Sequence, residues 1–285
     1  GDEQANIAWA QALEQVGVHV VYGVVGLKTH AKVTLVVRND PTGIRRYVHV
    51  GTGNYNPKTA QIYEDVGLLS ADETLGEDVS ELFNYLTGYS RQRRFGRLMV
   101  APVGLRSGMI RLIRREAARP GGGRIILKVN SLVDTEVVDA LYEASGSGVD
   151  IDLVVRVPCS LRPGVPGLSE RIRVRSLVGR FLEHSRIFRF GPDGRDVQYF
   201  IGSADLMPRN LDRRVEAMVP VDELSLQKQL AQILSTELQD DVLAWELHPD
   251  GTWTKVSLRT GVNAQRVFQE LAIARAHSPE SAQHA

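Results

Sequence analysis

The sequence predicts a mixed α/β (α+β) fold in which two related domains follow one another along the chain. The 285 residues are enough for about two domains, since one domain usually contains roughly 100–200 residues. Short apolar segments alternate with amphipathic ones, as strands and helices do in such proteins. A histidine motif with similar surroundings occurs twice, which indicates an internal repeat and hence two related domains.

The first half is expected to begin in a helix that is already in progress, in residues 1–16, with the opening segment of the domain missing. The segments that follow are rich in β-branched residues or have apolar residues at helical spacing. They predict strands at Gly17–Val25, Ala31–Val37, Arg45–Val50 and Asp65–Ser70, and a helix at Gly76–Tyr89.

The second half begins near Pro102 with an arginine-rich amphipathic segment that a Pro-Gly-Gly-Gly breaker ends. We expect helices at Leu105–Ala118 and Asp134–Ser145 and from Leu224 to about Ala244, and strands at Arg124–Val129, Ile151–Val157, Arg171–Val178, Ser185–Phe190, Val197–Gly202 and Val215–Val221. The predicted domains are residues 1–100 and 101–262, followed by a polar tail at 263–285 that a short helix opens.

Composition excludes several classes of protein. The formal net charge is zero, and no apolar run reaches the roughly 18 residues of a membrane-spanning helix or has the pattern of a signal peptide. The single cysteine, Cys159, excludes an internal disulfide framework, fits a reducing compartment and is interpreted as a core residue. We expect a cytoplasmic protein, with membrane association in the cell left open.

Arginine is clustered although the net charge is zero. Nine arginines and one acidic residue lie between Arg91 and Arg119, and eight arginines and two acidic residues lie between Arg156 and Arg189. The planar donors of a guanidinium group suit phosphate oxygens. These two stretches therefore indicate either a phosphate-rich ligand or merely solvated helix faces, and the sequence leaves both readings open.

The internal repeat consists of a His-x-basic triplet and a later turn of small residues. His30 and Lys32 form the first triplet, and the turn Gly-Thr-Gly-Asn begins 21 residues after His30. His184 and Arg186 form the second, and the turn Gly-Ser-Ala-Asp begins 18 residues after His184. One such triplet often occurs by chance, but two in matched surroundings predict a shared role.

The triplets suit phosphoryl chemistry. Residues i and i+2 of a strand project to the same face, so each histidine lies beside a fixed cation. A neutral imidazole can attack phosphorus, while the cation and the N–H groups of the turn hold the oxygens that gain charge. A second histidine across a cleft can protonate the leaving oxygen. The sequence has no zinc-ligand spacing and no Walker A motif.

Together the triplets and turns resemble the phospholipase D superfamily, whose members place paired histidines across a cleft between two domains. The usual aspartate after the lysine is absent, with Arg38 in that stretch, and the second triplet ends in arginine, which counts against an ordinary phosphodiesterase. One branch fits better. The segments GVHVVYGVVGLKTHAKVTLVVR, YVHVGTGNYNPKTAQIYEDVGLLSAD, LVVRVPCSL, LEHSRIFRF and IGSADLMPRNLDRRVE are similar to the type-1 polyphosphate kinases.

That resemblance implies the C-terminal catalytic region of a polyphosphate kinase, a phosphotransferase that moves the terminal phosphate of ATP reversibly to polyphosphate through a phosphohistidine. It implies that His30 is the autophosphorylated residue and that His184 is the acid. The residues that it implies at the nucleotide and its phosphates are Tyr63, Arg156, His184, Lys32 and Arg186. From the residues alone, Tyr63 is equally well a core residue and Arg156 a surface residue.

The resemblance also implies Mg²⁺, with a metal site upstream of this chain and none within it. The expected partners are ATP, ADP and inorganic polyphosphate, without nucleic acid, and the intact enzyme is expected to be a homo-oligomer. Because family members carry two further domains first, the chain resembles a fragment, and its activity alone is left open. Two other readings also remain: a phospholipase-D-like phosphodiesterase, and an inactive polyanion-binding fragment.

Overall fold

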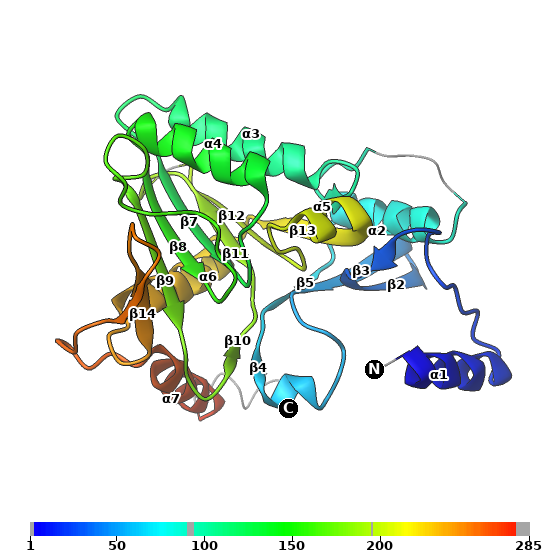
Figure 1. Ribbon diagram of the computed structural model, residues 1–285. Coiled ribbons are helices and arrows are strands. Elements are labelled where there is room, and N and C mark those ends of the chain that lie inside the picture. Colours follow the sequence, from blue (N-terminus) through cyan, green and yellow to red (C-terminus); the bar gives the residue numbers. More distant parts are fainter. Residues whose placement is uncertain (1–2, 90–93, 195, 278–285) are drawn as a thin grey trace.

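A ten-stranded mixed sheet forms the centre of the computed structural model, which describes residues 3–89, 94–194 and 196–277 (Figure 1). Its strands run in the order β1-β13-β12-β11-β7-β8-β9-β14-β15, and β6 pairs with β13. Their bounds are β1 Lys28–Thr29, β6 Met99–Ala101, β7 Arg124–Val129, β8 Asp150–Val155, β9 Ile172–Leu177, β11 Ile187–Phe190, β12 Gln198–Gly202, β13 Arg214–Val221, β14 Ala244–Leu247 and β15 Trp253–Lys255. The predicted mixed α/β class is confirmed.

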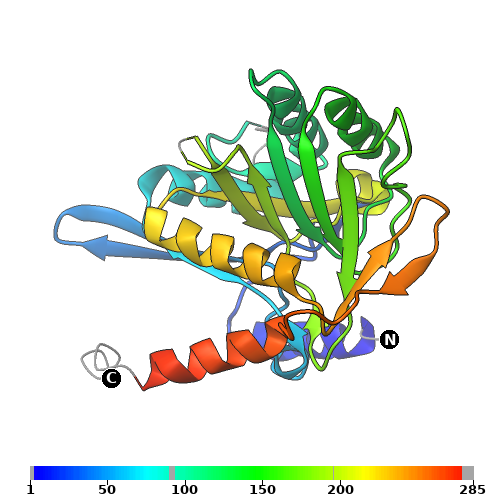
Figure 2. The same ribbon diagram turned by 90° about the vertical axis from the view of Figure 1, so that its left-hand side faces the viewer.

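Helices cover both faces of this sheet (Figures 1 and 2). On one face lie α3 (Leu105–Ala117) and α4 (Thr135–Gly146), and on the other lies α6 (Leu224–Gln239). Side chains alternate along a strand, so Ile125 and Leu127 of β7 join the core beneath α3 and α4, whereas Ile126 joins the core beneath α6. Lys128 follows Ile126 on the same side of the sheet.

The first half contains a smaller sheet of three antiparallel strands in the order β2-β3-β5. These strands are β2 (Lys32–Asp40), β3 (Gly43–Gly51) and β5 (Gly67–Ser70), and the β2–β3 hairpin projects from the body as an arm (Figure 2). Helix α2 (Glu73–Leu86) covers the base of this sheet. Its apolar face shares a core with β3 and with β12 and β13 of the second half, so the two halves are packed together.

Two short parallel pairings also join the halves. Strand β1 adds to the edge of the second-half sheet through β13. Strand β4 (Tyr63–Glu64) pairs with β10 (Leu182–Glu183), directly after the short 3-10 helix η1 (Thr59–Gln61). Because β1 precedes His30 and β10 precedes His184, both predicted histidines lie where the halves meet.

Two sequence-based expectations fail. The segment Gly17–Val25, predicted as a strand, follows α1 (Glu3–Gln15) but is irregular and largely exposed, with Val25 fully exposed. Its β-branched residues have strand propensity, but none of the described strands pairs with it. The helix predicted from Leu224 to about Ala244 ends at Gln239, because the Asp240 carboxylate accepts hydrogen bonds from the next backbone N–H groups and turns the chain into β14.

The predicted tail contains helix α7 (Ala264–Ala276), while residues 278–285 lie outside the described part of the chain. Helix α7 is part of the packed structure, because Ala264 and Phe268 contact a small cluster with Leu177 and Leu238. Short helix α5 (Pro208–Arg213) precedes β13. Cys159 lies half-buried against the main core. None of the described helices combines the length and the apolarity needed to cross a bilayer.

Candidate active site

The two predicted histidines come from equivalent positions in the two halves. His30 lies between β1 and β2, and its backbone N–H donates to the Val215 carbonyl of β13 at 2.9 Å. His184 follows β10, and its backbone N–H donates to the Glu64 carbonyl of β4 at 3.2 Å. Each histidine is therefore anchored to a strand of the other half, and both side chains are mostly buried.

Each imidazole is also held by a carboxylate of the other half. His30 Nδ1 lies 2.9 Å from Glu216 Oε2 of β13, and His184 Nδ1 lies 2.8 Å from Asp65 Oδ1, next to β4. An ionised carboxylate can only accept, so each Nδ1 carries a proton. His184 Nε2 also lies 3.3 Å from Arg186 Nη1. This exchange of carboxylates makes the site depend on both halves.

The turns of the repeat hold these carboxylates in place. Thr52 Oγ1 donates to Asp65 Oδ1 at 2.6 Å, and Ser203 Oγ donates to Glu216 Oε2. In both cases the carboxylate comes 13 residues after the hydroxyl. The sequence analysis missed Asp65 and Glu216. The matching interval of 13 residues was the available signal, but it becomes visible only when the two turns are aligned.

Burial and charge favour a neutral His30. Burial lowers the pKa of His30, although the hydrogen bond and charge of Glu216 act in the opposite direction. The nearby cations Lys32 and Arg214 lower this pKa further. A neutral imidazole with a free Nε2 is the form that can act as a nucleophile.

Lys32 lies beside His30, as the triplet predicts, and is almost completely buried. Its ammonium group donates to the His30 carbonyl oxygen. Burial lowers the pKa of Lys32 to about 8, and the positive charges of Arg186 and Arg214 contribute to this shift. The group therefore loses its charge near the upper end of the physiological pH range.

Arg186 occupies the corresponding place beside His184, but most of its donors bind protein atoms. Nη1 donates to the carbonyl oxygens of Thr52 and His184 at 3.2 and 2.8 Å, and Nε and Nη2 donate to Asp205. Asp205 ends the Gly-Ser-Ala-Asp turn of the repeat. Arg186 thus links the two turns and has few donors left for a ligand.

Tyr63 and Arg156 complete the group of predicted residues. The Tyr63 ring packs against the His184 ring with 4.8 Å between centroids. Arg156 follows β8, is half-buried and lies close to Asp205, Arg186 and Tyr63. Its guanidinium has no hydrogen bond or ion pair with any of the described residues. The structure thus brings all six predicted site residues to the boundary between the halves.

The two arginine stretches are mostly neutralised by nearby acids. In the first stretch, of which Arg91 and Arg93 lie outside the described residues, the ion-paired members are Arg97, Arg106, Arg114, Arg115 and Arg119. In the second they are Arg171, Arg173, Arg175, Arg186 and Arg189. Most of these arginines therefore have a structural explanation.

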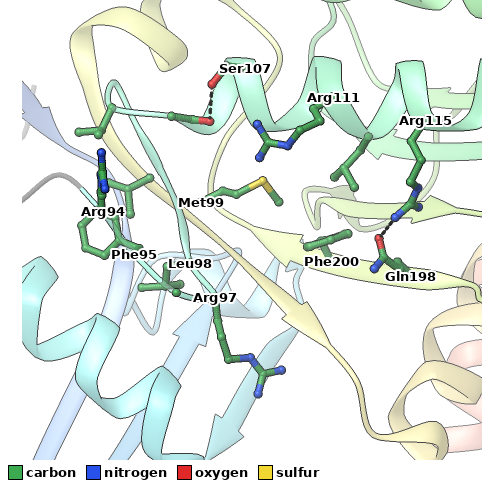
Figure 3. Close-up of a pocket in the computed structure, with 15 residues that line it drawn as sticks. Arg94, Phe95, Arg97, Leu98, Met99, Ser107, Arg111, Arg115, Gln198 and Phe200 are labelled. Carbon is green, nitrogen blue, oxygen red and sulfur yellow. Dashed lines mark hydrogen bonds between the residues drawn. The ribbon is translucent and has the colours of Figure 1, made fainter.

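A cavity of about 680 Å³ lies away from the histidines, between α3, β6 and β12 (Figure 3). Arg94, Arg97, Arg111 and Arg115 line it together with apolar side chains, including Met99. Arg115 donates a hydrogen bond to Gln198 and forms an ion pair with Glu116. Arg97 forms ion pairs with Asp72 and Asp222. None of the predicted site residues lines this cavity, so the boundary between the halves remains the candidate site.

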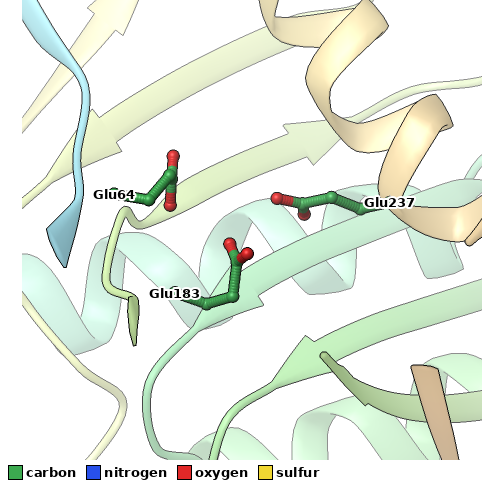
Figure 4. Close-up of side chains that lie close together, drawn as sticks. All are labelled: Glu64, Glu183 and Glu237. Carbon is green, nitrogen blue, oxygen red and sulfur yellow. The ribbon is translucent and has the colours of Figure 1, made fainter. Parts of the chain in front are cut away.

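One group of described carboxylates is close enough to be tested as a metal site. Single oxygens of Glu64, Glu183 and Glu237 lie within 4.8 Å of one another (Figure 4). The Lys128 ammonium occupies the space among them and contacts all three. This group therefore does not fit a resident Mg²⁺ ion.

Comparison with known proteins identifies two consecutive family domains. Residues 1–92 match the model of the polyphosphate kinase C-terminal domain 1, and residues 98–266 match that of the polyphosphate kinase C-terminal domain 2. The polyphosphate kinase of Thermosynechococcus vestitus is 57% identical over 277 residues, which are 96% of this chain and 38% of that protein. That of Streptomyces coelicolor is 53% identical, over 95% of this chain and 37% of that protein.

A solved structure agrees with these matches. The crystal structure of polyphosphate kinase from Porphyromonas gingivalis superimposes with a TM-score of 0.88 at 36% identity, covering 95% of this chain and 42% of that one. This chain thus spans about two fifths of the length of such relatives. By sequence and by structure, the chain belongs to the polyphosphate kinase family.

Proposed function

We propose that this chain is the catalytic region of a polyphosphate kinase, which transfers the terminal phosphoryl group of ATP reversibly to inorganic polyphosphate. The observation that carries this proposal is the exchange of carboxylates, His30 with Glu216 and His184 with Asp65. It gives two histidines at one boundary, each oriented by a carboxylate at Nδ1. Membership in the family supports the choice of ATP and polyphosphate as substrates.

His30 is the proposed nucleophile. Its Nε2 attacks the terminal phosphorus of ATP, a P–N bond forms, and the P–O bond to ADP breaks. In the second step a terminal oxygen of polyphosphate attacks the same phosphorus, and the P–N bond breaks. Glu216 keeps the proton on Nδ1 and stabilises the positive charge that the ring gains, as the carboxylate does in hydrolase triads.

His184 is the proposed acid, since it faces the site from the other half with its own carboxylate partner. In this role its ring carries a proton on both nitrogens: Asp65 binds the Nδ1 proton, and Nε2 gives its proton to the leaving oxygen. We assign Tyr63 to the adenine ring, as the family resemblance implies, because it is an aromatic side chain next to His184. Arg156 and Lys32 are the proposed phosphate ligands, since a planar guanidinium and a buried ammonium offer donors to phosphate oxygens. Arg186 would add charge and hold both turns.

The wider assignments belong to the same proposal. Mg²⁺ would accompany the nucleotide and neutralise its phosphates, without a carboxylate site of its own among the described residues. The intact enzyme would be a homo-oligomer, and nucleic acid is not an expected ligand. The catalytic domains would be residues 1–100 and 101–262, and the matched family domains, 1–92 and 98–266, support a division near this point.

Labelling the full-length protein with ATP carrying ³²P at the γ position tests the function. We expect a protein label that is stable in alkali and lost in acid, as a phosphohistidine is, and no label on His30→Ala. His49→Ala is the matched control, because His49 is a partly buried histidine of β3 outside the site. Equal labelling of His30→Ala and the parent would overturn the nucleophile. Hydrolysis of a phosphodiester without labelling from ATP would favour the phosphodiesterase.

A further inference from the structure

Lys128 lies at the centre of a buried group of charges that phosphoryl transfer does not itself use. Its Nζ lies 2.9 Å from Glu64 Oε2 and 2.7 Å from Glu183 Oε2, and it also contacts Glu237 Oε1. We call these four residues the Lys128 cluster (Figure 4 shows its carboxylates). The side chains of Lys128, Glu183 and Glu237 are at most 5% exposed, so ordinary surface pairing does not explain the cluster.

The cluster joins four elements from both halves. Glu64 belongs to β4, Glu183 to β10, Lys128 to β7 and Glu237 to α6. Ser185 Oγ also donates to both Glu64 carboxylate oxygens, at 2.8 and 2.9 Å. A buried ammonium that lost these partners would remain uncompensated, which is strongly unfavourable. The cluster therefore fixes the β4 and β10 strands against the main sheet.

The sequence neighbours of the two strand carboxylates are predicted site residues. Glu64 lies between Tyr63 and Asp65, and Glu183 directly precedes His184. Consecutive side chains of a strand point to opposite faces, so the β4–β10 pair directs Glu64 and Glu183 to Lys128 and the site residues to the other side. The pair itself is only two residues long and has few backbone hydrogen bonds. Its position must therefore depend on side chains.

Helix α7 also holds strand β10 in place. Gln265 Nε2 donates to Glu183 Oε1 and to the Phe181 carbonyl, both at 2.8 Å, while Gln265 Oε1 accepts from the Phe181 N–H at 3.0 Å. From β9, Arg175 Nη1 donates to the main-chain oxygens of Glu237 and Leu238 at the end of α6. Gln265 and Arg175 thus hold in place the strand that carries Glu183 and the helix end that carries Glu237.

We propose that Lys128 is a positioning residue for phosphoryl transfer: by binding Glu64 and Glu183 it holds the β4–β10 pair, and with it Tyr63, Asp65 and His184, in the geometry that faces His30. This inference rests on the proposed function. It assigns Lys128 no contact with substrate.

Glu237 carries the proton that reduces the excess negative charge of the cluster. Burial and the charges of Glu183 and Glu64 raise the pKa of Glu237 to about 8, although Lys128 acts in the opposite direction. Its Oε2 is buried and has no hydrogen-bond partner among the described residues. Because this pKa lies above that of an unfolded glutamate, Glu237 lowers stability progressively as the pH rises from about 4.5 to about 8.

The main test uses Glu64→Gln in the full-length protein. Gln keeps the shape of the side chain but, without the negative charge, binds Lys128 more weakly. The β4–β10 pair can then shift, and a displacement of catalytic groups by about 1 Å can lower a rate by about 10²-fold. We expect a loss of that order in kcat, and a higher KM for ATP because Tyr63 moves as well. Asp152→Asn is the control, since Asp152 of β8 is a largely buried carboxylate that binds Arg124 of β7 and Arg173 of β9, away from the site. Both variants lose some thermal stability.

Two further variants keep the proposal testable if Glu64→Gln folds poorly. Lys128→Met should lower kcat as Glu64→Gln does, because it removes the common partner. Glu237→Gln should keep the contact to Lys128 and flatten the decline of the melting temperature between pH 5 and 8. Kinetics for Glu64→Gln and Lys128→Met equal to those of Asp152→Asn would overturn the proposal. Labelling of His30→Ala would overturn the proposed function instead.

Discussion

Glu216 decides which nitrogen of His30 is free. In Glu216→Gln an amide N–H can donate to Nδ1, and the ring proton then moves to Nε2, the nitrogen proposed to attack phosphorus. We expect phosphorylation of the protein to fall by about 10³–10⁴-fold, the order of loss seen when a triad aspartate is changed to asparagine. Labelling from ATP measures it, with Glu143→Gln, on the surface of α4, as the control. A loss below tenfold would mean that Glu216 does not determine which nitrogen of His30 carries the proton.

The pKa of Lys32 predicts a pH dependence. Its value of about 8 means that the ammonium charge is complete well below pH 8 and is lost as the pH rises through 8. Phosphate favours the charged form, so the affinity for polyphosphate should decline over this range. Lys32→Gln should bind more weakly at low pH and show a flatter profile. Titrations at pH 6.5, 8 and 9 decide the matter, and identical profiles for both proteins would exclude Lys32 as a phosphate ligand.

The sequence predicted the residues of the site that form local patterns. His30, Lys32, His184 and Arg186 stand in triplets, and a triplet is visible without the fold. Asp65 and Glu216 could not be assigned in that way, because each one's partner lies in the other half. Their role arises only when β1 pairs with β13 and β4 pairs with β10.

At the scale of elements, the first turn of the repeat leaves room for Asp65. A Cβ at Gly53 would lie 2.1 Å from Asp65 Oδ2, so Gly53→Ala must displace the carboxylate that orients His184. We expect a large loss of kcat with little change in the protein label on His30. Ala204 holds the corresponding place in the second turn, and Ala204→Gly is the matched control. Normal turnover of Gly53→Ala would show that the turn can shift while Asp65 keeps its contact with His184.

Element boundaries were predictable where the periodic pattern is interrupted by a breaker. Helix α3 ends near Pro120 as expected, whereas α6 was predicted too long because no glycine or proline marks its end. Asp240 ends it by side-chain hydrogen bonds to three following N–H groups, and a lone aspartate is not a distinctive signal. The Gly17–Val25 segment shows the reverse case, in which strand propensity without a partner gives no strand.

At the scale of the whole molecule, most of the described arginines in the two arginine stretches form ion pairs with acids instead of a free basic surface. Arg156 at the site is an exception, because its guanidinium has no partner among the described residues. Arg156→Gln should therefore reduce the affinity for polyphosphate, and the slope of log K against log salt concentration should fall by about one. Arg171→Gln, which removes an exposed arginine paired with Asp150, should change the salt slope little. Titrations at two or more salt concentrations compare them. Equal slopes would place the phosphate chain elsewhere.

The exchange of carboxylates has the form of an isologous contact, in which one surface meets its own equivalent across a two-fold axis. Symmetric dimers are built in this way, with residue i touching j and j touching i. Here the arrangement lies within one chain, as in a dimer whose subunits have become covalently continuous. Either half alone would carry a histidine with no carboxylate to orient it. Under the proposed function, a partly folded chain would therefore present no oriented nucleophile to ATP, because each histidine gains its carboxylate only when the halves dock.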